Sequence, residues 1–358
     1  MSKNVLIVGA GVVGLTTAIE LKNKYKDSVN ITIISKDLPG DDAVFYTSPK
    51  AGAHWISSNK KEQKEWHLVT YHKLKELSKI PETFIKPYPL YMGDIVPKGK
   101  KAPEYEEPWF KKYVDGFQYL GTDPKFPGVE NIYCFDSYTI STTYYLIYLL
   151  SQARKLGIHI QRHTLKALKD AETFKLENGS VADLIINCTG LLYNFLSDCH
   201  DSKLKPVRGH VIVLENNLPY QVTFEQPYLP KDAKDGEFLM LFPRPEGGAI
   251  LGGIYDKNFL NYDTSIDNNY VKRLLEKART YLPDLLKDAH HPNELKIAKH
   301  VIGFRPERQG GARIGVDPSN PLVVHNYGNG NSGYIESWGC AKSTAELVGS
   351  ILFPSPKL

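Results

Sequence analysis

The sequence predicts an α/β fold in which a Rossmann-like nucleotide-binding domain is interleaved with a second domain built on a mostly antiparallel β-sheet. Three observations favour this fold. An apolar run at residues 4–8 leads into a glycine-rich turn and a helical pattern at residues 15–21, which is typical of a Rossmann-like unit. Strand patterns separated by turn residues fill residues 207–255, which indicates antiparallel pairing. A second glycine loop at residues 328–333 precedes another helical segment.

The individual elements follow from hydrophobic periodicity and from the residues that end each pattern. Residues 30–34 predict a second strand, and the small, polar residues 41–55 predict a loop. Residues 80–128 are dense in Pro, Lys, Tyr and Glu, which favours long connections in the second domain. Helices are predicted at residues 60–77, 141–156, 270–281 and 338–352, and further strands at 158–160, 182–188, 207–214, 238–242, 249–255 and 322–325.

Both predicted domains are discontinuous, because the nucleotide-binding pattern returns in the middle and in the last segment of the chain. A chain of 358 residues has room for two domains. We assign residues 1–75, 140–195 and 296–358 to the nucleotide-binding domain. Residues 76–139 and 196–295 are assigned to the second, substrate-binding domain.

Composition excludes several classes of function. The formal net charge is only +4, and the dense basic run 98–101 fits a solvated loop, so we expect no nucleic-acid partner. Four widely spaced cysteines form no CxxC pair, which predicts no metal site and an intracellular compartment. No apolar segment reaches the roughly 18 residues of a membrane helix, so we expect no membrane partner.

The first glycine-rich turn carries the clearest chemical signal. Gly9, Gly11 and Gly14 form a GxGxxG pattern between a strand and a helix. Such glycines allow a tight turn, let backbone N–H groups approach a pyrophosphate and let the helix pack on the strand, so the pattern predicts a dinucleotide site. The second strand ends at Ser35-Lys36, with Asp37 beyond it, so the usual acidic ribose ligand is missing and FAD and NAD both stay open.

Three further segments are candidate ligand contacts. Ala51-Gly52-Ala53 has little side-chain bulk, so its backbone could lie against a flat ring or simply pack tightly. The glycine loop 328–333 suits a close ligand at a helix start, or is a plain strand–helix turn. Arg305 precedes Pro306, which favours an extended backbone, and its guanidinium could bind a carboxylate bidentately or lie on the surface.

Together these segments resemble the D-amino-acid oxidases and their relatives the D-aspartate oxidases, and a yeast-type member in particular. The resemblance runs nearly end to end, in several ordered motifs. They are GAGVVGL at 9–15, TSPKAGAHW at 47–55, INCTG at 186–190, PVRGH at 206–210, GGIY at 252–255, GFRPERQGG at 303–311 and HNYGNGNSGY at 325–334.

The resemblance implies an FAD oxidase that converts D-amino acids to 2-oxo acids, ammonia and hydrogen peroxide. In this family a hydride passes from the substrate to flavin N5, and oxygen reoxidises the flavin. Positioning and desolvation carry the hydride step, whereas the cofactor supplies the chemistry. The implied partners are therefore FAD, a D-amino acid and O2, without a metal.

The resemblance also implies site residues. Arg305 and Tyr255 would bind the substrate carboxylate, and Asn331 would reach its amine. FAD would contact Gly9, Gly11, Val12, Val13, Gly14, Ser35, Lys36, Thr47, Ser48, Ala51, Gly52, Ala53, His54, Leu165, Thr189, Gly190, Arg305, Gly330, Asn331, Ser332, Gly333, Tyr334 and Ile335.

Four positions depart from the family pattern. Met240 falls where the family often has a tyrosine, and the lost hydroxyl predicts a weaker or rearranged substrate anchor. Lys50 replaces a frequent tryptophan, and His54 a frequent asparagine, so His54 is either a flavin hydrogen-bonder or a packing residue. Ile335 stands where some yeast-type relatives carry glutamine.

Neutral D-amino acids are the expected substrates. Tyr255 stands where D-aspartate oxidases often carry an arginine, and Phe224, which we align near the pocket entrance, is apolar. The alternative is a D-aspartate oxidase in which Arg244, or else His54 or Lys50, supplies a cation. A divergent FAD amine or glycine oxidase and a flavin-binding protein without turnover are further alternatives.

The last three residues, Pro356-Lys357-Leu358, resemble a peroxisomal import signal. They predict a peroxisomal location with an import receptor as partner; if they are an ordinary frayed terminus, the location is cytoplasmic. The family resemblance also implies a homodimer.

Overall fold

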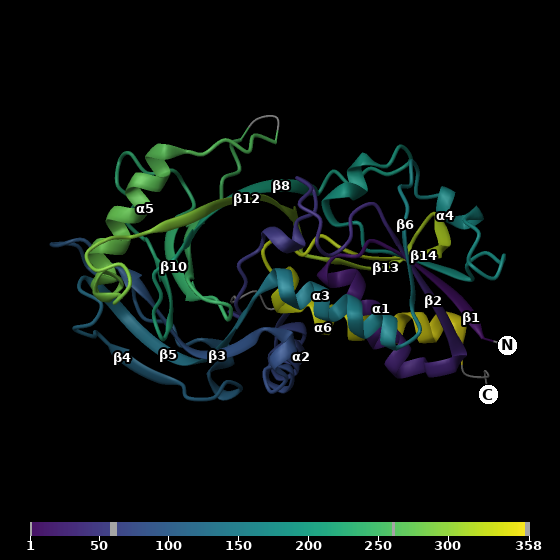
Figure 1. Cartoon of the computed structure of the whole chain (residues 1–358), viewed down its shortest axis with the longest axis horizontal. Coiled ribbons are helices and arrows are strands. Elements are labelled where there is room, and N and C mark those ends of the chain that lie inside the picture. Colours follow the sequence, from purple (N-terminus) through teal and green to yellow (C-terminus); the bar gives the residue numbers. More distant parts are fainter. Residues whose placement is uncertain (1, 58–62, 260–261, 355–358) are drawn as a thin grey trace.

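The computed structural model describes residues 2–57, 63–259 and 262–354. Its strands form two sheets, of six and eight strands, which occupy opposite halves of an elongated molecule (Figure 1). The six-stranded sheet is mainly parallel and the eight-stranded sheet mainly antiparallel. The predicted α/β fold class, with a Rossmann-like half and a mostly antiparallel half, is therefore confirmed.

The six-stranded sheet is parallel except at its edge, where one strand is antiparallel. In spatial order its strands are β13 (Arg313–Asp317), β14 (Asn320–Tyr327), β7 (Leu184–Asn187), β1 (Lys3–Val8), β2 (Val29–Ser35) and β6 (His159–Arg162). β1 lies at the centre and is buried on both faces, which explains its continuous apolar run.

Helices cover both faces of this sheet. Val5 and Ile7 of β1 face a core formed with four long helices, whereas Leu6 and Val8 face a second cluster that includes Ala171 of the short α4. The helices are α1 (Val12–Tyr25), α2 (Lys64–Leu77), α3 (Thr142–Lys155), α4 (Asp170–Thr173) and α6 (Gly333–Leu352).

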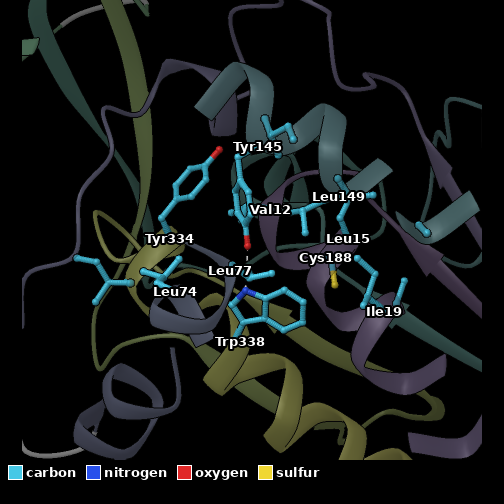
Figure 2. Close-up of a cluster of buried hydrophobic side chains, with 14 of the residues drawn as sticks. Val12, Leu15, Ile19, Leu74, Leu77, Tyr145, Leu149, Cys188, Tyr334 and Trp338 are labelled. Carbon is cyan, nitrogen blue, oxygen red and sulfur yellow. Dashed lines mark hydrogen bonds between the residues drawn. The ribbon is translucent and has the colours of Figure 1, made fainter. Parts of the chain in front are cut away.

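An aromatic hydrogen bond joins α3 and α6 in the first core. Figure 2 shows Trp338 directly below Tyr145, and the indole Nε1–H donates to the Tyr145 hydroxyl at 2.9 Å. Both side chains are buried, so this bond satisfies polar atoms that water does not reach. It fixes the two helices beside each other, next to the N-terminal end of α6.

The eight-stranded sheet is antiparallel except for one parallel pair, β9 with β3. In spatial order its strands are β12 (Ile297–Arg308), β8 (Leu204–Leu214), β11 (Ala249–Ile254), β10 (Glu237–Pro243), β9 (Gln221–Glu225), β3 (Ile85–Ile95), β5 (Val129–Ile140) and β4 (Gln118–Gly121). The sheet curves strongly in Figure 1, where α5 (Asn268–Tyr281) lies on its outer side.

Alternation along the strands gives the two faces of this sheet different environments. Leu239 and Leu241 of β10 pack with Leu274 of α5 in one core. Met240 and Phe242, between and beyond them, belong to a separate cluster on the opposite face. Since successive side chains of a strand point to opposite faces, α5 covers the outer face and leaves the inner face toward the other half of the molecule.

Several strands were not predicted from the sequence. β3 and β4 lie where we expected mainly long connections, and β5, β9, β12 and β13 were also missed. β3 carries Pro87 and Pro89, and most of β12 is only half-buried, so neither shows a clear alternating or apolar run. The extended backbone expected at Arg305 is confirmed, because this residue lies within β12.

The sheet membership also differs from our assignment of segments at one place. Residues 296–308 were assigned to the nucleotide-binding domain, but β12 pairs along its whole length with β8 of the eight-stranded sheet. The half-buried pattern of β12 did not reveal this pairing, because its partner lies about 90 residues earlier in the chain. The remaining domain boundaries stay a prediction.

Several helices begin at other residues than expected: α1 starts at Val12 rather than Leu15, and α5 at Asn268 rather than Tyr270. α6 starts at Gly333, directly after the glycine loop, rather than at Trp338. Helix α2 starts at Lys64, and the predicted helical residues 60–62 lie outside the described residues, as do Pro356-Lys357-Leu358.

Short 3-10 helices occupy Lys26–Ser28, Ser48–Lys50, Pro81–Thr83, Trp109–Lys112, Gly190–Phe195 and Pro283–Lys287. Within the described ranges, no helix has both the length and the apolarity that crossing a membrane requires.

The contact between α2 and α6 depends on a missing side chain. A Cβ atom on Gly339 would lie 2.2 Å from the Cα atom of Trp66, so the two backbones would have to separate. We expect Gly339→Ala to destabilise the fold by about 1–3 kcal/mol, as overpacking of a core does. Chemical denaturation followed by circular dichroism should show a lower midpoint.

A matched substitution provides the control. Gly315 of β13 has no atom within 4 Å of an added Cβ, so Gly315→Ala makes the same chemical change in open space. Its denaturation midpoint should stay close to that of the unmodified protein. Equal losses in both variants would contradict the proposed steric role of Gly339.

Candidate active site

A cavity of about 740 Å³ lies between the two halves of the molecule. The turn after β1, the loop before α2 and the second glycine loop form part of its wall, and the inner face of the eight-stranded sheet forms another part. Most of the predicted site residues line it: Gly9, Gly11, Val12, Val13, Ser35, Lys36, Thr47, Ser48, Ala51, Gly52, Ala53, His54, Leu165, Thr189, Gly190, Tyr255, Arg305, Gly330, Asn331, Gly333, Tyr334 and Ile335. Gly14 and Ser332 are not part of this lining.

The β1–α1 turn brings the N-terminus of α1 to the cavity. Gly9 has φ +115°, and a Cβ there would lie 2.5 Å from the carbonyl oxygen of Cys188. Gly14 lies behind the cavity wall and lets α1 pack closely on the turn, because a Cβ atom added there would lie 2.0 Å from the carbonyl oxygen of Gly9. The Val12 N–H donates to Ser48 Oγ at 3.0 Å, so the helix start already attracts an electronegative partner.

The segment after β2 places an acidic residue, Asp37, at the cavity. Asp37 lines the cavity and is buried, although it comes two residues after the strand ends. The Ser35 hydroxyl donates to the Asp37 carbonyl oxygen at 2.7 Å and accepts the Ala10 N–H at 3.1 Å, which folds the chain back toward the glycine turn. Burial raises the pKa of the Asp37 carboxyl, opposed by Lys36. The sequence reading, which required the acid at the strand end, missed it.

The loop before α2 is held tightly against the eight-stranded sheet. A Cβ on Gly52 would lie 2.1 Å from the ring of Phe242, and His54 stacks on that ring at 4.5 Å between centroids. His54 Nδ1 lies 2.9 Å from Gln221 Oε1. Burial lowers the pKa of His54 to about 4, and the hydrogen bond to Gln221 offsets this only in part. His54 is therefore a neutral packing residue near pH 7 and supplies no positive charge.

Arg305 and Tyr255 form a pair on the inner face of the sheet. The guanidinium carbon lies 4.4 Å from the centre of the tyrosine ring, a cation–π distance. Arg305 Nη1 donates to the carbonyl oxygens of Ile254 at 3.0 Å and Arg208 at 3.3 Å. Gly209 provides room, since a Cβ there would lie 2.7 Å from the guanidinium nitrogens.

This pair is suited to bind an anion. Within residues 2–57, 63–259 and 262–354, no carboxylate comes within ion-pair distance of Arg305. Burial raises the pKa of Tyr255 to about 12, although Arg305 lowers it, so the hydroxyl stays protonated and can donate near pH 7. A guanidinium and a phenol hydroxyl facing one cavity form a carboxylate site.

The second glycine loop closes the cavity beside these residues. Gly330 has φ +57°, and its N–H donates to the carbonyl oxygen of Pro306 at 2.9 Å. Asn331 is exposed to the cavity, and its Oδ1 accepts from Ser332 Oγ at 3.3 Å. The Tyr334 hydroxyl donates to the Ser48 carbonyl oxygen at 2.9 Å and so connects α6 to the first loop.

Two residues considered for substrate selection lie elsewhere. Phe224 was expected near the pocket, but it is fully buried in the core with α5, on the outer face of β9. Its neighbours Thr223 and Glu225 line the cavity instead, and the sequence reading missed both. Arg244 forms an ion pair with Glu246 and is absent from the cavity lining.

Other expected positions do line the cavity. Met240 and Lys50 both reach it, and Lys50 forms an ion pair with Asp42. The sequence reading missed further lining residues because they lie in strands or loops without a motif; they include Tyr46, His163, Val211, Glu237, Phe238 and Phe242. In the part of the chain that the structure describes, no group of three or more His, Cys, Asp or Glu residues could hold a metal ion.

Comparison with known protein families matches residues 4–347 to the family described as FAD dependent oxidoreductase. The chain belongs to this family. It is 32% identical to a D-amino-acid oxidase of Fusarium vanettenii, and 98% of each chain is covered. It is 31% identical to a D-amino-acid oxidase of Schizosaccharomyces pombe, with coverage of 97% of this chain and 96% of the relative.

Solved structures agree on the fold. An L-proline dehydrogenase from P. horikoshii superimposes with a TM-score of 0.72 at 14% sequence identity, covering 97% of this chain and 93% of that chain. At that identity the likeness establishes the architecture of the FAD-dependent oxidoreductase. Its substrate has to be argued from the residues of the site.

The residues of the cavity fit FAD. The volume lies within the usual range of ligand pockets, and the N-terminus of α1 can bind a diphosphate through backbone N–H groups. Asp37 is available for a ribose, and Ala51-Gly52-Ala53 presents a wall without bulky side chains.

The neutral state of His54 predicts sensitivity to acid. Its pKa of about 4 in the fold lies below the ordinary histidine value of 6.5. The fold therefore loses stability as pH falls from about 6.5 to about 4, by about 3 kcal/mol from this group. His54→Gln should reduce that loss, measured as denaturant midpoints of the FAD-loaded protein at pH 7 and 4.5. His72→Gln, at an exposed histidine, should leave the loss intact; the same pH dependence in both variants would contradict the assignment.

Proposed function

We propose that this FAD-dependent oxidoreductase deaminates D-amino acids oxidatively, with O2 as the electron acceptor. The single observation that carries the proposal is the pairing of Arg305 with Tyr255 at the cavity wall. These two groups offer a cation and a hydroxyl donor to one carboxylate, which simple amines lack. The relatives named D-amino-acid oxidase, at about one third identity over nearly the whole chain, support the same substrate class.

The residues of the chain bind and orient the substrate. Arg305 and Tyr255 hold the carboxylate, and Asn331, exposed on the adjoining glycine loop, faces the same cavity and would hold the amine. Two fixed groups on one carbon leave only one enantiomer able to present its hydrogen toward the cofactor while its side chain lies along the sheet. The apolar Met240 and Phe238 exclude water around the reacting carbon.

Over the whole reaction, no side chain of the protein gains or loses a proton. FAD, when bound, would supply the acceptor for a hydride from Cα, and O2 would take up this hydride together with the proton lost from the substrate amine, giving hydrogen peroxide. The carbon–hydrogen bond at Cα breaks and a carbon–nitrogen double bond forms. Water then hydrolyses the imino acid to a 2-oxo acid and ammonia. Because Arg305 remains charged throughout, it binds substrate and product alike and acts by positioning.

Location and assembly are also proposals. Import into peroxisomes rests on Pro356-Lys357-Leu358, outside the described residues, and suits an enzyme that releases hydrogen peroxide. A reporter protein that carries these residues should gather in peroxisomes, and a diffuse signal would contradict the proposal.

A homodimer rests on the family resemblance, and sedimentation of the holoenzyme at near double the 40.3 kDa chain mass would support it.

Removing the guanidinium tests the carboxylate site. We expect Arg305→Leu to lower kcat/KM for D-alanine by about 30-fold to 5,000-fold, because a paired buried charge is worth about 2–5 kcal/mol. Peroxide release with saturating FAD measures this, and the visible flavin spectrum confirms that cofactor is bound.

The matched control is Arg279→Leu, at an exposed position on α5 that is not part of the cavity lining. It should keep the turnover of the unmodified enzyme. If Arg305→Leu oxidised D-alanine as fast as Arg279→Leu, the assigned carboxylate site would be wrong. If the unmodified holoenzyme oxidised no D-amino acid at all, the proposed function itself would fail.

A further inference from the structure

The cavity contains a carboxylate that the proposed reaction does not use. Glu225 ends β9 on the inner face of the sheet, two residues after Thr223, and both line the cavity. Phe224 between them points to the opposite face, into the core. The parity of the strand therefore directs Glu225 into the same space as Arg305 and Tyr255.

Glu225 differs from the other acidic residue on this wall. Glu237 is buried and held by Arg273 at 2.6 Å and Lys277 at 2.9 Å, so its charge is already balanced. Glu225 is exposed to the cavity, and among the described residues no cation lies within ion-pair distance of it and no donor hydrogen-bonds to its side chain. A ligand entering the cavity meets this carboxylate without a competing partner.

The surroundings of Glu225 favour a positively charged group beside it. Desolvation in the wall raises the pKa of Glu225 above its usual range, and Asp94, its register partner on β3, raises it further. A cation placed there would relieve both effects.

The sheet order sets the separation between the two ends of the substrate. Arg305 reaches across β8 and donates to the carbonyl oxygen of Ile254 at the end of β11, so the carboxylate site lies over β11. Glu225 lies on β9, and β10 is between them. Two strand spacings amount to about 10 Å. A four-carbon ammonium stem with a hydrogen bond at each end suits that distance.

We propose that Glu225 makes this enzyme select D-amino acids with a cationic side chain, of the lysine and arginine class. The proposal rests on the proposed oxidase function and deepens it. Met240, on β10 between the two ends, offers an apolar surface for the methylene stem. The same carboxylate repels D-aspartate and D-glutamate, and the three cations considered for those substrates do not supply the opposite charge, because His54 is neutral and Lys50 and Arg244 are paired.

The test compares two substrates with similar side-chain stems, one of which carries a terminal positive charge. For the FAD-loaded enzyme, kcat/KM from oxygen consumption is measured with D-lysine and with D-norleucine, which has a similar stem without the charge. The ratio of the two should exceed one. In Glu225→Gln that ratio should fall about tenfold to a hundredfold, as loss of a charged hydrogen bond predicts. Glu276→Gln, at an exposed position on α5, should keep the ratio of the unmodified enzyme.

A charge-reversing variant tests the role of Glu225 by a gain of activity, so the test does not rely only on the lower ratio in Glu225→Gln. Glu225→Lys should raise the ratio of D-glutamate to D-glutamine turnover, which a merely damaged site would not do. A ratio of D-lysine to D-norleucine at or below one in the unmodified enzyme would overturn the proposal, and so would an unchanged ratio in Glu225→Gln. D-alanine separates the two levels: its oxidation without any preference for the cation refutes only the role of Glu225, whereas no turnover of any D-amino acid refutes the oxidase function as well.

Discussion

The cavity depends on glycines on the inner face of the eight-stranded sheet, which leave room for the larger side chains that line it. The outer face carries Leu239 and Leu241 against α5, and burying each such side chain stabilises the fold by about 1.5–3 kcal/mol. The inner face carries Gly209, Gly252 and Gly303 at positions where a Cβ would collide with Arg305, with Met240 and with Lys50. One sheet therefore forms a core on one side and leaves room for a ligand on the other, because side chains alternate along each strand. The cavity costs the protein the packing that this face would otherwise contribute.

The Rossmann-like half fixes the other wall of the cavity to that sheet. The Thr47 hydroxyl donates to the carbonyl oxygen of Phe304 at 2.9 Å, and the Tyr334 hydroxyl donates to that of Ser48 at 2.9 Å. These bonds connect the loop before α2 to β12 and to the start of α6. The N-terminus of α1, where the diphosphate of FAD would bind, is thereby held at a fixed place relative to Arg305. Because both bonds end on backbone carbonyl groups, they hold the two walls of the cavity in a fixed relative position, as catalysis by positioning requires.

The two walls of the cavity differ in how well they could be predicted from the sequence. GxGxxG and the loop 328–333 act through glycine backbone, so their role is local and readable, and both line the cavity. Asp37 was discounted because it does not end β2, yet the Ser35 hydroxyl binds the Asp37 carbonyl and folds the chain back toward the glycine turn. β3 and β12 were not found, since their pairing partners are distant in sequence and their exposure pattern shows no period of two. The residues of the glycine motifs lie at the cavity, whereas Phe224, which was assigned by alignment within a strand, does not.

Phe224 shows the physical reason for that difference. A shift by one residue exchanges the two faces of a strand, so an alignment that is correct in its motifs can still assign the wrong neighbour to the pocket. The register of β9 against β10, with Thr223 opposite Met240, settles the parity and places Glu225 inside. The lost tyrosine hydroxyl at position 240 then has a consistent meaning. A flexible methionine in place of a hydrogen-bonding group removes a polar contact from the middle of the site and leaves polar groups at its two ends, Arg305 with Tyr255 and Glu225. Such a site binds a substrate by its ends, which is what a long cationic D-amino acid offers.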